Sequence, residues 1–210
     1  KNITSNPLSS WILYEDEQII AINKPEAIAV HAGTKQDYGL VDLASNYFGQ
    51  KCYLVHRLDK AVSGVILLTK NRNACKVILE KWHDVACHKS YQAVVFSSQL
   101  EQCVINTPLP DKASLADKNK NSQSAVTHIQ PLASVNGLTW ADIEIKTGRY
   151  HQIRRHLALI NKPIVGDSRY GHFDKNRVYA KEHKINGLWL HAQSITFFHP
   201  KGTWQTIKAN

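Results

Sequence analysis

Residues 56–68 read His56-Arg57-Leu58-Asp59-Lys60-Ala61-Val62-Ser63-Gly64-Val65-Ile66-Leu67-Leu68. The carboxylate of Asp59 stands between two cations, and a Ser-Gly pair leads from it into four consecutive apolar residues. We interpret these four residues as a buried strand, which places Asp59 at the edge of a core. Adjacent cations keep a carboxylate ionised, as nucleophilic or general-base catalysis requires. From these residues alone, an ordinary surface ion pair is the alternative.

Outward from this stretch, the chain alternates between short strands and a few helices. Acidic turn residues separate two apolar runs at 11–14 and 19–22, which is typical of a β-hairpin. Apolar spacing predicts helices over residues 40–48, 73–87 and 151–160, the first ending at Gly49 and the last before Pro163. Further strands are expected over residues 91–96, 125–128, 138–145, 188–198 and 203–207. This order predicts an α+β fold with a mostly antiparallel sheet.

Two of these segments carry more specific expectations. In the helix over residues 73–87, the apolar face is expected to consist mainly of Val77, Ile78, Leu79 and Trp82. Residues 107–123 begin with Pro-Leu-Pro and continue with polar residues that offer almost nothing to bury. They predict a mobile surface loop inside the domain.

The charge of the chain is strongly positive and unevenly distributed. The 26 Lys and Arg exceed the 17 Asp and Glu, which gives a formal net charge of +9. Residues 146–184 contain ten Lys and Arg and three Asp and Glu, so this segment accounts for +7 of that charge. Cations interleaved with aromatic rings suit contacts with phosphates and stacking on bases. The pattern favours a nucleic-acid partner over a merely solvated basic face.

Several classes of protein fit the sequence poorly. No apolar run reaches the roughly 18 residues that a membrane span needs, so we expect no membrane association. The four cysteines form no Cys-x-x-Cys pair, which predicts reduced thiols in a cytoplasmic protein and neither a disulfide framework nor a zinc site. No metal site is expected.

A second segment with possible chemistry runs from Gly148 to His156. On a helix, His151, Arg154 and Arg155 share one face, while Ile153 and Leu157 point towards the core. One arginine on that face could bind a buried carboxylate through two parallel hydrogen bonds. The alternative is a solvated basic helix.

Together these segments resemble the RluA family of RNA pseudouridine synthases. The His-Arg-Leu-Asp motif at 56–59 is joined, in the family's order, by Asn23-Lys24-Pro25 with Val30-His31, Lys89-Ser90-Tyr91, residues 148–156, Ile164-Val165-Gly166-Asp167, Leu190-His191-Ala192 and His199-Pro200. The resemblance extends over about residues 11–208, nearly the whole chain.

The resemblance implies a mixed, mostly antiparallel sheet in two halves, with a central active-site cleft. We expect one catalytic domain over residues 1–210. Many relatives also carry a small N-terminal S4-type RNA-binding domain, but only about ten residues precede the first expected strand here, so we expect this domain to be lacking, with its removal as the alternative. Members of the family need no cofactor, and the expected partner is RNA. No obligate protein partner is implied.

The resemblance also assigns roles to individual residues. Asp59 matches the catalytic carboxylate, Arg154 the arginine that pairs with it, and Tyr91 the aromatic ring that packs against the target base. Arg57 is expected to enter the RNA where the uridine is flipped out, and Leu190 to form the aliphatic wall of the base pocket. The remaining RNA contacts are expected from His56, Lys60, Arg149, His151 and Arg155.

Three questions about function stay open at this point. The absence of an S4-type domain and the doubled Arg154-Arg155 favour tRNA as the substrate, through similarity to the C-type tRNA subgroup, with ribosomal RNA as the alternative. Asp59 could attack or deprotonate the ribose, the route we favour, or add to the uracil ring. A non-catalytic RNA-binding protein would explain the charge without needing Asp59, whereas a hydrolase would normally need a metal or a second carboxylate.

Overall fold

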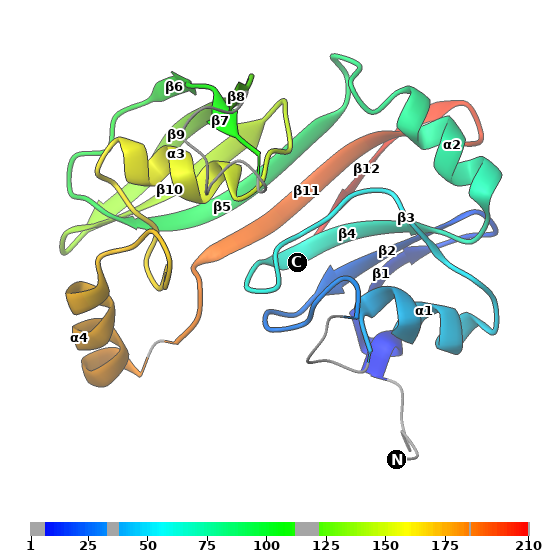
Figure 1. The fold of residues 1–210 in the computed structure, drawn as a ribbon, viewed down its shortest axis with the longest axis horizontal. Helices are drawn as coiled ribbons and strands as arrows, with labels where there is room; N and C mark the ends of the chain where they lie inside the picture. The colour runs from blue at the N-terminus through cyan, green and yellow to red at the C-terminus, as the bar shows by residue number, and fades with distance from the viewer. Residues whose placement is uncertain (1–6, 33–37, 112–121, 185, 210) are drawn as a thin grey trace. The chain divides into compact units, whose positions relative to one another are not determined.

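The computed structural model describes residues 7–32, 38–111, 122–184 and 186–209. These residues form two compact units, one of residues 1–88 and 192–210 and the other of residues 89–191. Both are built on antiparallel strands with a few helices (Figure 1). The predicted α+β class and mostly antiparallel sheet are confirmed. The expected single domain and central cleft stay predictions.

The first unit is a sheet with two helices and a short 3-10 turn, η1 (Pro7–Trp11). Its strands are β1 (Ile12–Glu15), β2 (Ile19–Lys24), β3 (Tyr53–Leu54), β4 (Ser63–Thr69), β12 (Thr203–Lys208) and, from residue 192 on, β11 (Leu190–His199). β2 pairs antiparallel with β1 and β4, β3 pairs with β4, and β12 pairs with β11. The predicted hairpin and C-terminal strands are therefore confirmed.

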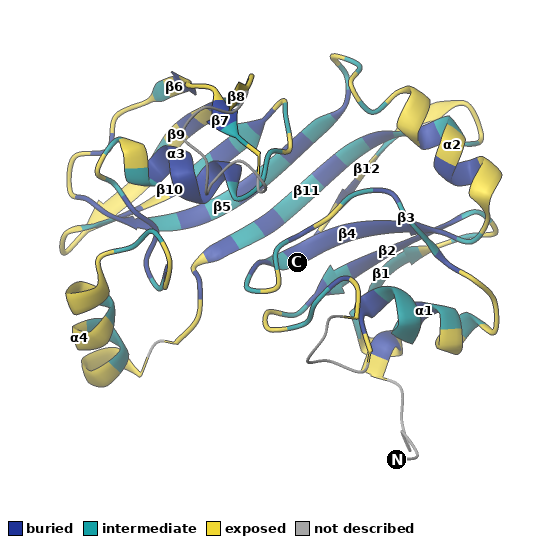
Figure 2. Cartoon of the chain, in the orientation of Figure 1, coloured by how far each residue is buried: buried dark blue, intermediate teal, exposed yellow. Residues whose placement is uncertain are grey.

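Strand β4 is almost entirely buried, as its apolar composition predicts (Figure 2). Val65 and Leu67 enter one core cluster with residues of β2, the second helix, β11 and β12, including Ile78 and Phe197. The loop that contains Asp59 leads straight into this strand, so its end is held by a well-packed core.

The two helices of this unit are α1 (Leu40–Phe48) and α2 (Arg72–Glu80). α1 ends as predicted at Gly49, whose φ of 64° is the left-handed conformation that glycine adopts readily. The prediction for α2 is wrong at its C-terminal end, because the chain leaves the helix at Lys81 and continues in turns. The N–H groups of Lys81 and Trp82 donate to the carbonyl oxygens three residues earlier, those of Ile78 and Leu79, so the last turn tightens and the helix stops. Further along, the side chain of Asp84 accepts the N–H of Ala86 in a turn.

The predicted apolar face of α2 is also partly wrong. Ile78 is fully buried and Trp82 packs against the core, but Leu79 is 44% exposed. The buried positions are Ala74, Cys75 and Ile78, at i, i+1 and i+4, so the buried face includes two small residues that the prediction left out.

The second unit is a four-stranded antiparallel sheet with two helices. Its strand order is β5 (His88–Phe96), β10 (Leu138–Ile145), β9 (Val126–Val135) and β6 (Cys103–Asn106). The helices are α3 (Gln152–Leu159) and α4 (Phe173–His183). α3 is nearly all buried and α4 has no buried residue, as Figure 2 shows. The sequence interpretation missed α4, which has no apolar stripe.

The expected surface loop over residues 107–123 is only partly described. Its two ends form a short ladder, β7 (Leu109–Pro110) with β8 (Ser122–Gln123), and Leu109 is buried. The expectation that this segment offers almost nothing to bury is therefore wrong at Leu109. Its predicted mobility concerns mainly residues 112–121, which lie outside the described residues.

Candidate active site

Asp59 lies in the loop between β3 and β4, where the sequence places it at the edge of the core. Leu58 beside it is buried, Asp59 is half-buried, and Arg57 and Lys60 are exposed. A hydrogen bond of 3.1 Å from Val62 N–H to the carbonyl oxygen of Asp59 closes the turn that enters β4. Leu58 therefore anchors the loop in the core, while the carboxylate of Asp59 and the two cations lie nearer the surface.

His56 fixes the start of this loop. Its Nε2 accepts a 3.1 Å hydrogen bond from the backbone N–H of Leu67, and its ring stacks on Trp82 with 5.3 Å between centroids. An imidazole nitrogen that accepts from a backbone N–H is unprotonated, so this geometry describes a neutral structural histidine. RNA contact by His56 stays a prediction.

Lys24, at the end of β2, fixes the other side of the loop. It is fully buried, and its Nζ donates to the carbonyl oxygens of Pro25 (2.8 Å), Ile28 (3.0 Å) and Lys60 (3.2 Å). Burial lowers the pKa of Lys24 to about 8, against the opposing attraction of the carboxylates of Asp59 and Glu26. In the sequence, Lys24 is recognised only as part of the Asn23-Lys24-Pro25 motif. Its burial could not be predicted, because lysines are seldom buried and no neighbouring residue indicates that this one is.

Arg154 lies on α3 and is buried together with Arg155 and His156, so the solvated basic helix is excluded. Its Nε and Nη2 each donate a 2.8 Å hydrogen bond to a carboxylate oxygen of Asp167. The carboxylate partner that the structure describes for Arg154 is thus Asp167. Its expected pairing with Asp59 stays a prediction.

α3 is attached to strand β9 by side chains that the sequence interpretation did not use. Gln152 donates to the carbonyl oxygen of Val126 and to Oγ1 of Thr127, and its own Oε1 accepts from Thr147 and from the N–H of Arg149. His156 is hydrogen-bonded to Thr127 Oγ1 at 2.8 Å, and burial lowers the pKa of its imidazole. These polar bonds hold the buried helix in one position.

The remaining predicted RNA-binding residues differ in exposure. His151 precedes α3 with a φ of 51°, and its ring stacks on Tyr150 at 3.8 Å between centroids. The Nε of Arg149 donates to the carbonyl oxygen of Ser124. Arg155 is only 9% exposed and donates to the carbonyl oxygens of Pro110 and Tyr150, so the structure gives it internal partners. RNA contact by these three residues stays a prediction.

Tyr91 and Leu190, the residues expected around the target base, are both buried. Tyr91 lies on β5 opposite Ile143 of β10 and is 8% exposed. Leu190 begins β11 and is 4% exposed. Their role at a base pocket stays a prediction.

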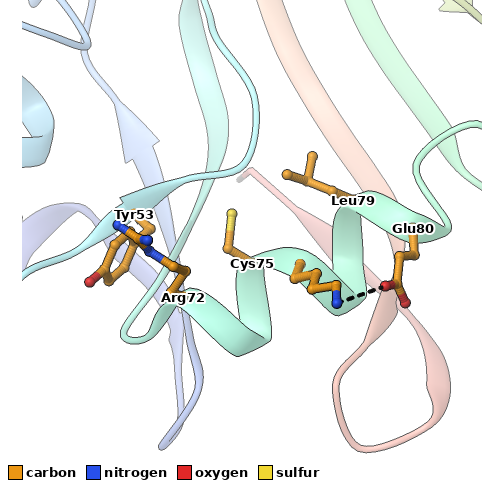
Figure 3. Close-up of a pocket in the computed structure, with 6 residues that line it drawn as sticks. Tyr53, Arg72, Cys75, Leu79 and Glu80 are labelled. Atoms are coloured by element: carbon orange, nitrogen blue, oxygen red, sulfur yellow. Dashed lines mark ion pairs between the residues drawn. The ribbon is translucent and has the colours of Figure 1, made fainter.

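A hollow of about 430 Å³ opens on the first unit beside α2 (Figure 3). Its lining residues are Tyr53, Arg72, Cys75, Lys76, Leu79 and Glu80. None of the ten predicted site residues, all of which the structure describes, lies among them. The guanidinium of Arg72 stands 5.9 Å from the Tyr53 ring, and Lys76 pairs with Glu80 across one turn of the helix.

The four cysteines are free, and burial raises the pKa of Cys52, Cys75 and Cys103. Within the described ranges, no group of three His, Cys, Asp or Glu side chains could hold a metal ion. The helices described here include none with the length and apolar character needed to cross a membrane.

Known proteins resemble this chain in both sequence and structure. The tRNA pseudouridine synthase C of Vibrio cholerae serotype O1 is 31% identical over 208 residues, covering 90% of this chain and 85% of that protein. The ribosomal large subunit pseudouridine synthase C of Buchnera aphidicola subsp. Acyrthosiphon pisum is 32% identical over 205 residues, covering 94% of this chain. This chain spans only 65% of the length of that relative.

Among solved structures, Human RNA Pseudouridylate Synthase Domain Containing 4 matches with a TM-score of 0.76 and 25% identity. The match covers 97% of this chain and 89% of that chain. A family model described as RNA pseudouridylate synthase matches residues 18–159, more than half of the chain. The chain therefore belongs to the RNA pseudouridylate synthase family, as the resemblance of its motifs predicts.

Proposed function

We propose that this chain isomerises uridine in RNA to pseudouridine, with Asp59 as the catalytic carboxylate. The observation that carries the proposal is the position of Asp59 in a chain of this family. It is a half-buried carboxylate between two exposed cations, in a loop attached to the core through His56 and Lys24. Such an anchored carboxylate can be held in one geometry during a reaction.

The reaction breaks the bond between the ribose and the base nitrogen, rotates the uracil and rebonds it through its C5 carbon. C5 then loses its proton and the freed N1 takes one up, so substrate and product have the same composition. In our proposal Asp59 acts at the ribose, and Arg154 orients its carboxylate. The hydroxyl of Tyr91 could assist the final removal of the proton.

The target uridine must leave the helical stack before it can reach Asp59. Unstacking costs a few kcal/mol, which contacts with phosphates and rings must offset. Arg57 is exposed beside Asp59 and is proposed to enter the RNA at the vacated position. Tyr91 and Leu190 are proposed to enclose the extruded base, and no metal or other cofactor takes part in the proposed reaction.

We propose tRNA as the substrate, in the cytoplasm, with an anticodon stem-loop as the target. Relatives named tRNA pseudouridine synthase C share 31–34% identity with this chain over 208–210 residues, and relatives named for the ribosomal large subunit share 32–34% over 201–210 residues. Sequence identity therefore does not distinguish tRNA from ribosomal RNA as the substrate. The proposal depends on the doubled Arg154-Arg155, which resembles the C-type tRNA subgroup. Incubation with total tRNA and with protein-free ribosomal RNA, followed by pseudouridine mapping, tests it. Modification of ribosomal RNA alone would contradict it.

The catalytic proposal is tested with RNA tritiated at C5 of uridine, because pseudouridine formation releases that hydrogen. Asp59→Asn is nearly isosteric but lacks a nucleophilic or basic oxygen. We expect it to fold and to bind RNA like the parent but to release no tritium. Asp84→Asn is the matched control, since Asp84 is also a half-buried loop carboxylate of the first unit. Its activity should stay within about twofold of the parent. Turnover by Asp59→Asn would show that Asp59 is only an ion-pair partner.

A further inference from the structure

Asp167 is a buried carboxylate with hydrogen-bond donors on both oxygens. It is fully buried, and its Oδ2 accepts from Arg154 Nε at 2.8 Å. Its Oδ1 accepts from Arg154 Nη2 at 2.8 Å and from the backbone N–H groups of Arg169 and Tyr170, both at 2.9 Å. Burial alone would raise the pKa of Asp167, but these donors hold it below the usual value. The side chain is thus an anion with four donors and a single guanidinium partner.

The turn that carries Asp167 is itself fixed to the fold. Asn176 of α4 accepts the N–H of Gly166 at 2.8 Å and donates to the carbonyl oxygen of Asp167 at 3.0 Å. Gly166 has a φ of 77°, and a Cβ at this position would overlap the carbonyl oxygen of Gly187. The carboxylate therefore projects from a backbone with little freedom to shift.

The guanidinium of Arg154 is consequently held on more than one side. Asp167 takes the edge formed by Nε and Nη2, and the ring of Tyr170 lies 5.3 Å from Cζ. Nη1 is at the opposite end, 3.4 Å from Nε2 of His151. Two parallel hydrogen bonds fix the plane of a guanidinium as well as its position, which a single contact would not do.

We propose that Asp167 is a positioning residue, which orients the Arg154 guanidinium for its work at Asp59. This inference rests on the proposed function. A buried arginine needs a partner for its charge, and Asp167 supplies it through Nε and Nη2 of the guanidinium. The orientation of Arg154 is then set before RNA binds, so the enzyme does not have to order a long flexible side chain during the reaction.

The experiment is a double-mutant cycle on the single-turnover rate of tritium release. Asp167→Asn keeps the shape of the side chain but removes its charge and replaces one acceptor oxygen by a donor. We expect the rate to fall at least tenfold, while the Kd for RNA stays within about twofold. In an Arg154→Lys background the two parallel hydrogen bonds to Asp167 are already lost. There Asp167→Asn should lower the single-turnover rate by less than about twofold.

A purely structural role predicts a different result, namely an equal loss of rate in both backgrounds or a loss of RNA affinity, and either would overturn the inference.

Asp174→Asn is the matched control, because Asp174 is an exposed carboxylate on α4 that pairs only with Arg177 among the partners described. If Asp167→Asn does not fold, the cycle is run with Asp167→Glu, which keeps the charge but displaces the carboxylate. An inactive parent would refute the proposed function, whereas an active parent with an unaffected Asp167→Asn would refute this inference alone.

Discussion

The Nζ of Lys24 donates a 3.2 Å hydrogen bond to the backbone carbonyl of Lys60, the residue next to Asp59. Lys24 ends β2 and is paired in register with Gly64, near the start of β4. One buried cation thus ties the end of one strand to the loop that enters the next. This hydrogen bond therefore restrains the loop that carries Asp59, the carboxylate proposed for catalysis.

Replacing Lys24 should therefore cost both stability and activity. Lys24→Met preserves much of the side-chain volume but leaves the carbonyls of Pro25, Ile28 and Lys60 without this donor. We expect the free energy of unfolding to fall by about 2 kcal/mol. The single-turnover rate should fall more than RNA affinity, since the loop of Asp59 is loosened. Denaturant unfolding and tritium release measure the two effects, and an unchanged rate in a destabilised protein would contradict the positional role.

The lowered pKa of Lys24 also predicts how stability depends on pH. Its pKa is about 8 in the folded chain and 10.5 for an ordinary lysine. Between these values Lys24 is neutral when folded and protonated when unfolded, so unfolding takes up a proton and a rising pH opposes it. The stability of the parent relative to Lys24→Met should rise by about 2 kcal/mol between pH 8 and 10. A constant or falling difference would show that Lys24 has an ordinary pKa.

The packing of Gly64 gives a physical reason for the Ser-Gly pair of the motif. Gly64 has a φ of 109°, and a Cβ there would overlap the backbone of Ala192 in β11. Gly64→Ala should lower the free energy of unfolding by about 3 kcal/mol or more. Gly202→Ala is the control, because its φ of 90° is also positive but no atom lies near its Cβ. It should cost only about 1 kcal/mol, and equal losses would mean that backbone strain alone explains both.

Local patterns were enough to predict most elements of the fold. The hairpin of β1 and β2, the end of α1 at Gly49 and the buried strand β4 follow from apolar runs and turn residues. α4 could not be predicted this way, because no residue of it is buried and periodicity reports burial. The early end of α2, where Lys81 and Trp82 donate to the carbonyl oxygens of Ile78 and Leu79, has no counterpart in the apolar spacing of the sequence.

The candidate site was less predictable than the fold. The position of Asp59 before a buried strand is readable from adjacent residues. The pairing of Arg154 with Asp167 joins residues 13 apart, and the three carbonyls around Lys24 come from two segments. Such contacts depend on tertiary structure, which no local pattern encodes. The same limit hid the burial of Arg155, which looks like a surface cation in the sequence.

RNA binding should weaken steeply as the salt concentration rises, because exposed cations of residues 146–184 are expected to contact phosphates. Of the ten cations in residues 146–184, Arg154 and Arg155 are buried, whereas six are exposed, namely Lys146, Arg169, Lys175, Arg177, Lys181 and Lys184. With four to six phosphate contacts, the slope of log K against log salt should be about −3 to −5 at roughly 0.7 per contact. A slope near zero would remove the argument from charge.

Exposed cations on α4 allow this prediction to be tested locally. Replacing Lys175, Arg177 and Lys181 by Gln removes three charges from a helix without buried residues, so the fold should be unaffected. The slope should become shallower by about 2, because each lost phosphate contact contributes roughly 0.7. Replacement of Lys51, Arg72 and Lys76 by Gln is the matched control, since these exposed cations belong to the first unit, beside Tyr53 or on α2. An equal change of slope in both triple variants would show that phosphate binding is not concentrated in residues 146–184. A change in the control variant alone would show that the phosphates bind to cations of the first unit instead.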